Sequence, residues 1–423
     1  MRIVTAQEAV SGIESGQQIF MQGAAAVPEI LLEALVRRAP ELRNVNLIHM
    51  HCEGPHPHLA PDMKDHFCHK ALFIGPNARP AINDGRAEYI PVFLSEIPLL
   101  FDQHIQPVDA AFINVSPPDE HGFCSLGTSV DTVIAAIRNT RTVIAQINRS
   151  MPRTLGDCFV HVSRIDYGVE VDMPPYEHAD PVIGEVERRI GEYVADLVQD
   201  EATLQMGIGA IPSAVCLYLN DKKNLGIHTE MFTDVLVDLV ERGIVTCERK
   251  TVDCGKIVVT FMMGTKRLYK FVDNNPMVEM RQVDYTNDTS VIRRQRRMTA
   301  INSAIEIDLT GQVSADSIGS RMYSGVGGQV DFIRGAALSE EGRSIIALPS
   351  TAADGKFSRI TVALKEGAGV TTTRAHVRTV VTEYGVAELF GQGFRERAER
   401  LIAIAHPDFR DELTSYARKA YGL

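Results

Sequence analysis

The chain contains two similar halves, and this internal repeat constrains its fold more than any single motif. The segment that begins at Ile19 matches the segment that begins at Thr203, so that Gly23 aligns with Gly207. Four further pairs follow in the same order: NVNLIHM with KNLGIHTEM, GTSVDTVIAA with GGQVDFIRGA, TVIAQIN with SIIALPS, and HVSRIDYGVE with HVRTVVTEYGVAE. Because loop insertions change the spacing of repeats but not their order, these pairs predict two similar domains in tandem.

A proline-rich segment separates the two halves. Residues 171–181, VDMPPYEHADP, contain three prolines and indicate a linker. Apolar residues between Ile183 and Leu197 then recur at helical spacing, which predicts an amphipathic helix at the start of the second half. We therefore predict an N-terminal domain over residues 1–175 and a C-terminal domain over residues 182–423.

Short β-branched runs alternate with helical patterns within each half, as is typical of βα units and mostly parallel sheets. PEILLEALVRRA indicates a helix with Pro28 at its first position, where a missing N–H group does no harm. The strand candidates are VNLIHM, LFIGP, AAFINVS, TVIAQIN, IVVTF and SIIALPS. The fold class is thus predicted to be α/β, with two doubly wound domains and the active site in the cleft between them.

Charge and composition exclude several function classes. With 43 basic and 54 acidic residues the net charge is −11, which disfavours nucleic-acid and anionic-membrane binding. The first residues lack the apolar core of a signal peptide, and no apolar run approaches the roughly 18–20 residues of a membrane span. Seven cysteines without a CxxC pair fit reduced thiols. We expect a cytoplasmic protein that binds neither nucleic acid nor membranes.

Two glycine-rich segments follow predicted strands, where ligands bind in open α/β sheets. In QMGIGAIP a strand turns through glycines into a helix, and the backbone N–H groups of such a turn can approach an anion. In MYSGVGGQVDF the glycines at 325, 327 and 328 suit an oxyanion site or a phosphate cradle. Each pattern alone also fits an ordinary tight turn.

A carboxylate follows another predicted strand, in NLGIHTEMFTD. This strand is expected to end near His228, which leaves Thr229, Glu230 and Met231 on the following turn. Partial removal from water makes a carboxylate a better nucleophile or base, so Glu230 is a candidate for either role. Spacing alone leaves open an exposed glutamate that caps the next helix.

Two further segments carry unusual compositions. Residues 49–69 contain six histidines and two cysteines, but without the regular spacing of structural zinc sites. We interpret this stretch as a loop that lines the cleft and expect no metal. The run RRQRR, Arg293 to Arg297, indicates a solvated face, with a contact to CoA phosphates or to a partner subunit as the alternative.

Long strings across essentially the whole chain resemble the acetyl-CoA hydrolase/transferase family. They include FIGPNARPAINDGRAEYIPVFLSEIP, VSPPDEHGFCSLGTSVD, INSAIEIDLTGQVSADSIG and the tail VVTEYGVAELFG, together with GIHTEM and GVGG. Within that family the chain is most similar to the 4-hydroxybutyrate and butyrate:acetate CoA-transferases. The resemblance implies transfer of CoA between an acyl-CoA and a small carboxylic acid, without a further cofactor, by a homodimer.

The resemblance also implies roles for individual residues. Glu230 matches the glutamate that forms a glutamyl-CoA thioester, and Asn302 matches an asparagine near the reacting carbonyl. Gly23 and Ala24 are similar to a first-domain turn that faces the site. The implied CoA- and substrate-binding residues of the second half are Gly207, Ile208, Gly209, Ala210, Ile211, Gly327 and Gly328.

These residue types suit the implied chemistry. A serine could form an acyl-enzyme, but only a carboxylate can itself become a thioester to CoA. The nearest alternative is an acetyl-CoA hydrolase, which would release the thiol without an added acid. A serine hydrolase of the α/β type is disfavoured because the chain lacks GxSxG. GIGAIP lacks the third glycine of a dinucleotide-binding GxGxxG.

Overall fold

The structure is a computed structural model that describes residues 1–179 and 181–423, so position 180 of the predicted linker lies outside the described residues. The chain forms two compact units, each built from several segments. Unit 1 comprises Met1–Ala179, Val258–Thr286 and Tyr323–Gly325, and unit 2 comprises residues 181–257, Asn287–Met322 and Val326–Leu423. The chain passes between the units at several places, and the domain bounds 1–175 and 182–423 stay a prediction.

Unit 1 is built on an eight-stranded sheet in which every neighbouring pair is parallel. In spatial order the strands are β1 (Arg2–Ile3), β10 (Tyr167–Val171), β8 (Thr142–Asn148), β6 (Ala110–Val115), β2 (Gln18–Met21), β3 (Val45–His49), β4 (Phe67–Ala71) and β5 (Ala87–Tyr89). The central strand β6 is buried along its whole length, as expected of a parallel sheet covered on both faces.

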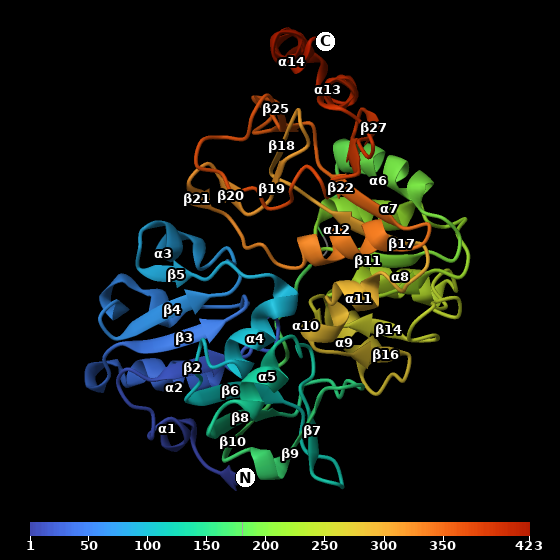
Figure 1. Ribbon diagram of the computed structural model, residues 1–423. Coiled ribbons are helices and arrows are strands. Elements are labelled where there is room, and N and C mark those ends of the chain that lie inside the picture. Colours follow the sequence, from blue (N-terminus) through green and yellow to red (C-terminus); the bar gives the residue numbers. More distant parts are fainter. Residues whose placement is uncertain (180) are drawn as a thin grey trace. The chain divides into compact units, whose positions relative to one another are not determined.

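Unit 1 contains the following helices among its described residues (Figure 1). They are α1 (Ala6–Ala9), α2 (Glu29–Arg37), α3 (Arg79–Asn83), α4 (Ile97–Asp102), α5 (Val133–Arg138), α9 (Lys266–Val272) and α10 (Val283–Thr286). On α2, Leu31, Leu32 and Leu35 point into the main hydrophobic cluster of the unit. Pro28 caps α2 rather than forming its first residue, a one-position difference from the prediction.

The small strands of unit 1 lie outside the main sheet. They are β7 (Phe123–Ser125), which pairs with β9 (Phe159–His161), together with β15 (Phe261–Met262) and β16 (Val278–Met280). Strand β14 (Ile257–Val259) begins at the boundary with unit 2 and pairs with β16.

Unit 2 is built on a six-stranded sheet. In spatial order the strands are β12 (Gly226–Ile227), β11 (Thr203–Met206), β17 (Met298–Asn302), β22 (Arg343–Ala347), β26 (Thr379–Thr382) and β27 (Gly385–Glu388). The first five strands are parallel, whereas β27 is antiparallel to β26. The carboxyl ends of β12, β11 and β17 therefore meet at one edge.

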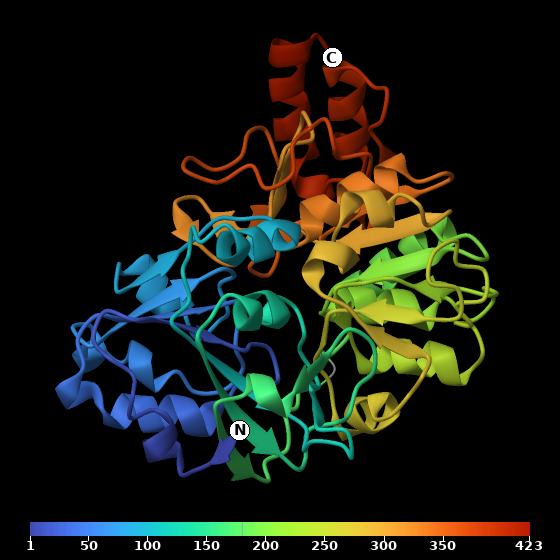
Figure 2. The same ribbon diagram turned by 60° about the horizontal axis from the view of Figure 1, so that its bottom comes forward.

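The helices of unit 2 are α6 (Glu185–Leu197), α7 (Ala210–Leu217), α8 (Asp234–Glu241), α11 (Thr289–Ile292), α12 (Gln329–Leu338), α13 (Phe394–Ala403) and α14 (Pro407–Tyr421). Helix α6 is the predicted amphipathic helix and packs against α7, while α12 packs against β17 and β22. The two last helices, α13 and α14, lie side by side (Figure 2). Short strands complete the unit: β13 (Met231–Phe232), β18 (Glu306–Asp308), β19 (Val313–Ser314), β20 (Ser317–Ile318), β21 (Arg321–Met322), β23 (Thr351–Ala352), β24 (Phe357–Ser358) and β25 (Ile360–Thr361).

The two sheets share the same strand order, which confirms the predicted pair of similar α/β domains. Unit 1 contains the run β10-β8-β6-β2-β3, and unit 2 contains the run β26-β22-β17-β11-β12. The first pair of matching sequences supplies β2 and β11, which occupy equivalent positions in the two runs. The TVIAQIN and SIIALPS pair supplies β8 and β22, again at equivalent positions. The repeat in the sequence is therefore a repeat of topology.

Two strand predictions were wrong. LFIGP is a loop, and the strand lies just before it in β4, where buried Phe67, His69 and Ala71 alternate with the partly exposed Cys68 and Lys70. IVVTF is not one strand but two short ones, β14 and β15, interrupted at residue 260. Apolar content alone marked both segments, and burial without sheet pairing explains the first error.

Membrane insertion by a helix has no support among the described residues. Every helix in that part of the chain is too short or too polar to cross a bilayer.

We predict that Leu35→Ala destabilises unit 1 by about 2–5 kcal/mol, because it leaves a cavity in a core that cannot fully collapse. Leu35 is completely buried against the central cluster. The matched control is Leu99→Ala on α4, where the side chain is 47% exposed and a loss within about 0.5 kcal/mol is expected. Urea unfolding of both variants measures the difference, and equal losses would contradict the proposed core.

Candidate active site

Glu230 lies at the carboxyl edge of the unit 2 sheet, between β12 and β13. The preceding residue fixes this position, because the hydroxyl of Thr229 accepts from the Met206 N–H group at 3.3 Å and donates to the Met206 carbonyl at 3.1 Å. The turn that carries Glu230 is thereby joined to the end of the neighbouring strand β11. The prediction placed Met231 on this turn as well, but Met231 begins the short strand β13.

The Glu230 carboxylate is partly removed from water and has one strong polar partner. The side-chain amide of Asn287, itself completely buried, donates to Glu230 Oε2 at 2.8 Å and to Asp331 Oδ2 at 3.4 Å. Burial raises the pKa of Glu230, because the charged form loses hydration, and the bond from Asn287 opposes this rise. The side chain is not sealed off, since part of its surface remains accessible.

The backbone of Gly328 forms the opposite side of this carboxylate pocket. A Cβ atom at this position would lie 1.9 Å from Glu230 Oε2 and 2.2 Å from Asn287 Nδ2, so any larger residue would displace these two side-chain groups. Gly328 also caps α12, whose N-terminal turn is held to the end of β17 by the bond from Gln329 Nε2 to the Ser303 carbonyl at 2.7 Å. The first N–H groups of a helix lack intrahelical partners and favour negative charge. Gly327, with φ of 58°, adopts the left-handed conformation that favours glycine.

The predicted segment from Gly207 to Ile211 forms the turn between β11 and α7. Gly209 caps the helix with φ of 122°, and open space surrounds the Cα atoms of Gly207 and Gly209. The Ile208 side chain is 42% exposed. This turn follows Met206 directly, so the bonds of Thr229 place it at the same sheet edge as Glu230.

Asn302 ends β17 at that same edge, but its side chain does not bind Glu230. Its amide donates to Gln205 Oε1 on the adjacent strand β11 at 2.9 Å. Gln205 is buried, and the pair therefore places a polar group beside the glycine turn.

The two residues predicted from the first half, Gly23 and Ala24, lie in unit 1 on the turn after β2. A Cβ atom at Gly23 would meet the His51 carbonyl oxygen at 2.6 Å, and Ala24 has φ of 52°. The Ala24 N–H group donates to the same carbonyl at 2.7 Å. The structure thus confirms a tight turn here, and a position facing the site stays a prediction.

Asn287 and Asp331 were missed by sequence reasoning as partners in the site. Asn287 lies between the one-turn helices α10 and α11, away from every glycine motif and predicted strand end. Nothing in the spacing of the sequence connects it with Glu230, 57 residues earlier. The repeat offers no guide either, because this segment belongs to none of the matched pairs.

The arginine run lies on the surface of unit 2, as predicted for a solvated face. Arg293, Arg294 and Arg296 are exposed. Arg296 and Arg297 both form ion pairs with Glu341, at 2.8 Å for Arg297 Nε.

Comparison with known proteins finds matches over most of the chain. The model of the acetyl-CoA hydrolase/transferase N-terminal domain matches residues 1–175, and that of the C-terminal domain matches residues 264–417. The 4-hydroxybutyrate coenzyme A transferase of Clostridium kluyveri is 51% identical over 99% of this chain and 98% of its own length. A succinyl-CoA:acetate/propanoyl-CoA:succinate CoA transferase of Fasciola hepatica is 49% identical over 96% of this chain and 85% of its own. The crystal structure of 4-hydroxybutyrate CoA-transferase from Porphyromonas gingivalis superposes with a TM-score of 0.87 at 40% identity and covers 99% and 98% of the two chains.

We predict that Gly328→Ala displaces the Glu230 carboxylate and destabilises unit 2 by about 1–3 kcal/mol, as expected for overpacking. The backbone of Gly328 has φ of −97°, which any residue adopts, so the clash alone carries the effect. Gly207→Ala is the matched control for stability, because its added methyl group meets open space. Thermal unfolding and a crystal structure of each variant provide the measurements, and an unmoved Glu230 in Gly328→Ala would refute the proposed contact.

Proposed function

Because this chain belongs to the acetyl-CoA hydrolase/transferase family, we propose that it is a CoA-transferase that moves CoA between an acyl-CoA and a small carboxylic acid. Its two relatives at 51% and 49% identity are both named as CoA transferases, and they differ in the named acids. We propose acetyl-CoA with 4-hydroxybutyrate or a short-chain fatty acid as the pair to test first. No metal or organic cofactor takes part in the proposed reaction.

The observation that carries this proposal is the environment of Glu230. A carboxylate with a raised pKa, held by one amide and pressed against a glycine backbone, is less hydrated than a surface glutamate. Loss of hydration makes a carboxylate a stronger nucleophile. Asn287 keeps the carboxylate from becoming protonated, because its N–H group stabilises the charged form that must react.

In the first half-reaction, a Glu230 carboxylate oxygen attacks the acyl-CoA carbonyl and the carbon–sulfur bond breaks. The products are a mixed anhydride and the CoA thiolate. The thiolate then attacks the glutamyl carbonyl of the anhydride, which releases the first acid as its carboxylate and leaves CoA on Glu230 as a thioester. Activation is retained throughout, so ATP is not required.

In the second half-reaction, the carboxylate of the second acid attacks the glutamyl thioester and displaces the CoA thiolate. This forms a new mixed anhydride, whose acyl carbonyl is then attacked by the thiolate. The products are the new acyl-CoA and the restored Glu230 carboxylate. Each step passes through a tetrahedral intermediate with a negative oxygen, which N–H donors must stabilise.

We assign the surrounding residues to these needs. The backbone of Gly327 and Gly328, at the N-terminus of α12, supplies donors to the oxyanion. Residues Gly207 to Ile211 contact CoA through their open turn, and Asn302, held by Gln205, orients the reacting carbonyl. For Gly23 and Ala24, on the turn after β2, a role in binding stays a prediction from the resemblance. A homodimer and a cytoplasmic location belong to the same proposal; the free state of all seven cysteines among the described residues supports a reducing compartment.

We predict that Glu230→Gln abolishes CoA exchange, by a factor on the order of 10³ or more, because an amide cannot form the anhydride. Incubation of the unmodified chain with acetyl-CoA alone should release acetate and add the mass of CoA at Glu230. Borohydride should reduce that thioester and mark the residue for mass spectrometry. Normal turnover in the glutamine variant would overturn the mechanism.

The same assay separates transfer from hydrolysis. A transferase forms a new acyl-CoA only when a second acid is added, whereas an acetyl-CoA hydrolase releases thiol without one. If the rate of thiol release is the same with and without added 4-hydroxybutyrate, butyrate or propionate, the protein is a hydrolase instead.

We predict that Asn287→Leu moves the acidic limb of the pH profile of kcat/KM to higher pH. The nucleophile must be ionised, and burial already raises the pKa of Glu230. Without the Asn287 donor the charged form loses its main stabilising bond, so the pKa rises further and activity is lost at a higher pH as the solution is acidified. Asn220→Leu, at an exposed site of the same unit, is the control and should leave the limb in place. An unchanged limb in Asn287→Leu would contradict the role of this bond.

A further inference from the structure

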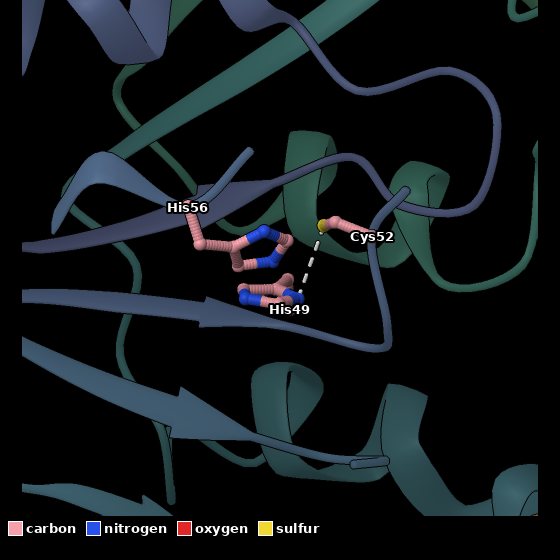
Figure 3. Close-up of side chains that lie close together, drawn as sticks. All are labelled: His49, Cys52 and His56. Carbon is pink, nitrogen blue, oxygen red and sulfur yellow. Dashed lines mark hydrogen bonds between the residues drawn. The ribbon is translucent and has the colours of Figure 1, made fainter. Parts of the chain in front are cut away.

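Unit 1 contains a buried cluster of histidines that the proposed reaction does not use. His49 ends β3, His58 lies in the 3₁₀ turn Pro57–Leu59, and His69 lies in β4. Their side chains are only 1%, 2% and 1% exposed. Cys52 and His56, on the loop between the two strands, complete the cluster, and Figure 3 shows His56 and Cys52 beside His49.

Three imidazole nitrogens converge at the centre of this cluster. His69 Nδ1 lies 2.9 Å from His58 Nε2 and 3.2 Å from His49 Nε2. The possible ligand atoms of the three residues all lie within 4.8 Å of one another. A tetrahedral zinc site with Zn–N bonds of about 2.0–2.1 Å separates its ligand nitrogens by about 3.4 Å. The cluster is therefore close to the geometry of a three-histidine site.

Hydrogen bonds among the three rings cannot pair all of the converging nitrogens, because His69 Nδ1 faces two of them. The three rings are buried, so a ring nitrogen left without a partner here also lacks hydrogen bonds to water. A neutral imidazole nitrogen carries either one N–H group or one lone pair, so His69 Nδ1 cannot satisfy both His49 Nε2 and His58 Nε2. A cation at the point of convergence removes the mismatch, because each nitrogen then presents a lone pair.

We propose that His49 Nε2, His58 Nε2 and His69 Nδ1 bind one divalent transition-metal ion, with zinc as the best match. Three nitrogen donors suit zinc and its neighbours and disfavour magnesium and calcium, which take oxygen ligands. This revises the expectation of no metal, which rested on irregular spacing in the sequence. Folding supplies the geometry that the spacing lacks, because two ligands come from adjacent strands and the third from the loop between them.

Cys52 contacts the ligand His49 and does not itself bind the ion. His49 Nδ1 lies 3.1 Å from Cys52 Sγ, so the N–H group of a metal-bound His49 would donate to this sulfur. Ligating histidines commonly use their second nitrogen in this way, which fixes the ring. The alternative grouping of His49, Cys52 and His56 would use that same Nδ1 atom as a ligand.

The ion would fix the turn that carries Gly23 and Ala24. The loop between β3 and β4 pairs with this turn, since Ala24 N–H donates to His51 at 2.7 Å and Glu53 N–H donates to Ala24 at 3.1 Å. An ion bound at one point to both strands and to the loop restricts the loop, and it stabilises the folded chain because the unfolded chain does not hold the three ligands together. We therefore expect the ion to stabilise unit 1 and to make this turn more rigid. It takes no part in the chemistry at Glu230.

The test is metal analysis of the full chain, purified without a polyhistidine tag. After treatment with a chelator, titration with Zn²⁺ should restore one ion per chain and raise the midpoint of thermal unfolding. His58→Phe keeps a ring of similar size and removes one ligand, so it should lose both the ion and the thermal response. His121→Phe, at an exposed histidine of the same unit, should keep both.

Two further measurements identify the ligands. Cys52→Ala should still bind one ion, with an affinity lower by a factor on the order of 10–100, as expected for loss of a supporting contact. The Co²⁺ form of the unmodified chain should lack a thiolate-to-cobalt charge-transfer band.

Each contrary result overturns the proposal. These results are less than one ion bound in excess Zn²⁺, full binding by His58→Phe, or a thiolate band together with loss of the ion in Cys52→Ala. Should His58→Phe fail to fold, the stoichiometry and the cobalt spectrum of the unmodified chain decide.

Discussion

The carboxylate of Glu230 lies where the backbone of Gly328 leaves no room for even one methyl group. This contact sets two requirements that oppose each other. In the proposed mechanism, the carboxylate must lose enough water to attack a thioester, yet it must remain ionised to do so. Asn287 meets the second requirement because its N–H group donates to Glu230 Oε2, and the close approach of the Gly328 backbone serves the first. The bonds of Thr229 to Met206 hold the turn that carries Glu230, and the bond from Gln329 to Ser303 holds the turn that carries Gly328.

Much of the fold could be predicted because the repeat and the long β-branched runs carry most of the information. Strands β6, β8 and β22 are almost wholly buried, so their sequences are mostly apolar, with only a few polar residues such as Asn114, Gln146 and Ser344. Strand β4 was missed because histidine and lysine interrupt its pattern, while the apolar residues after it are buried without pairing to a neighbouring strand. Hydrophobic periodicity predicts which residues are buried. It predicts a strand correctly only where the buried residues also pair with a neighbouring strand.

The site could be predicted in part, for a related physical reason. Glu230, the glycine turns and Asn302 lie at strand ends or helix starts, and those positions follow from the alternation of strands and helices. Asn287 lies on a connection between two short helices, and only the packing of the whole unit brings it to Glu230. The histidines of unit 1 show the same limit, because their spacing along the chain conceals the convergence of their nitrogens.

The shared strand order makes β3 the counterpart of β12, so His49 and His228 end or follow equivalent strands in the two halves. The same topology therefore presents the same kind of sheet edge twice, with different side chains at each edge. In unit 2 the edge after β12 carries Glu230, whereas the corresponding edge of unit 1, at the end of β3, carries His49 of the histidine cluster.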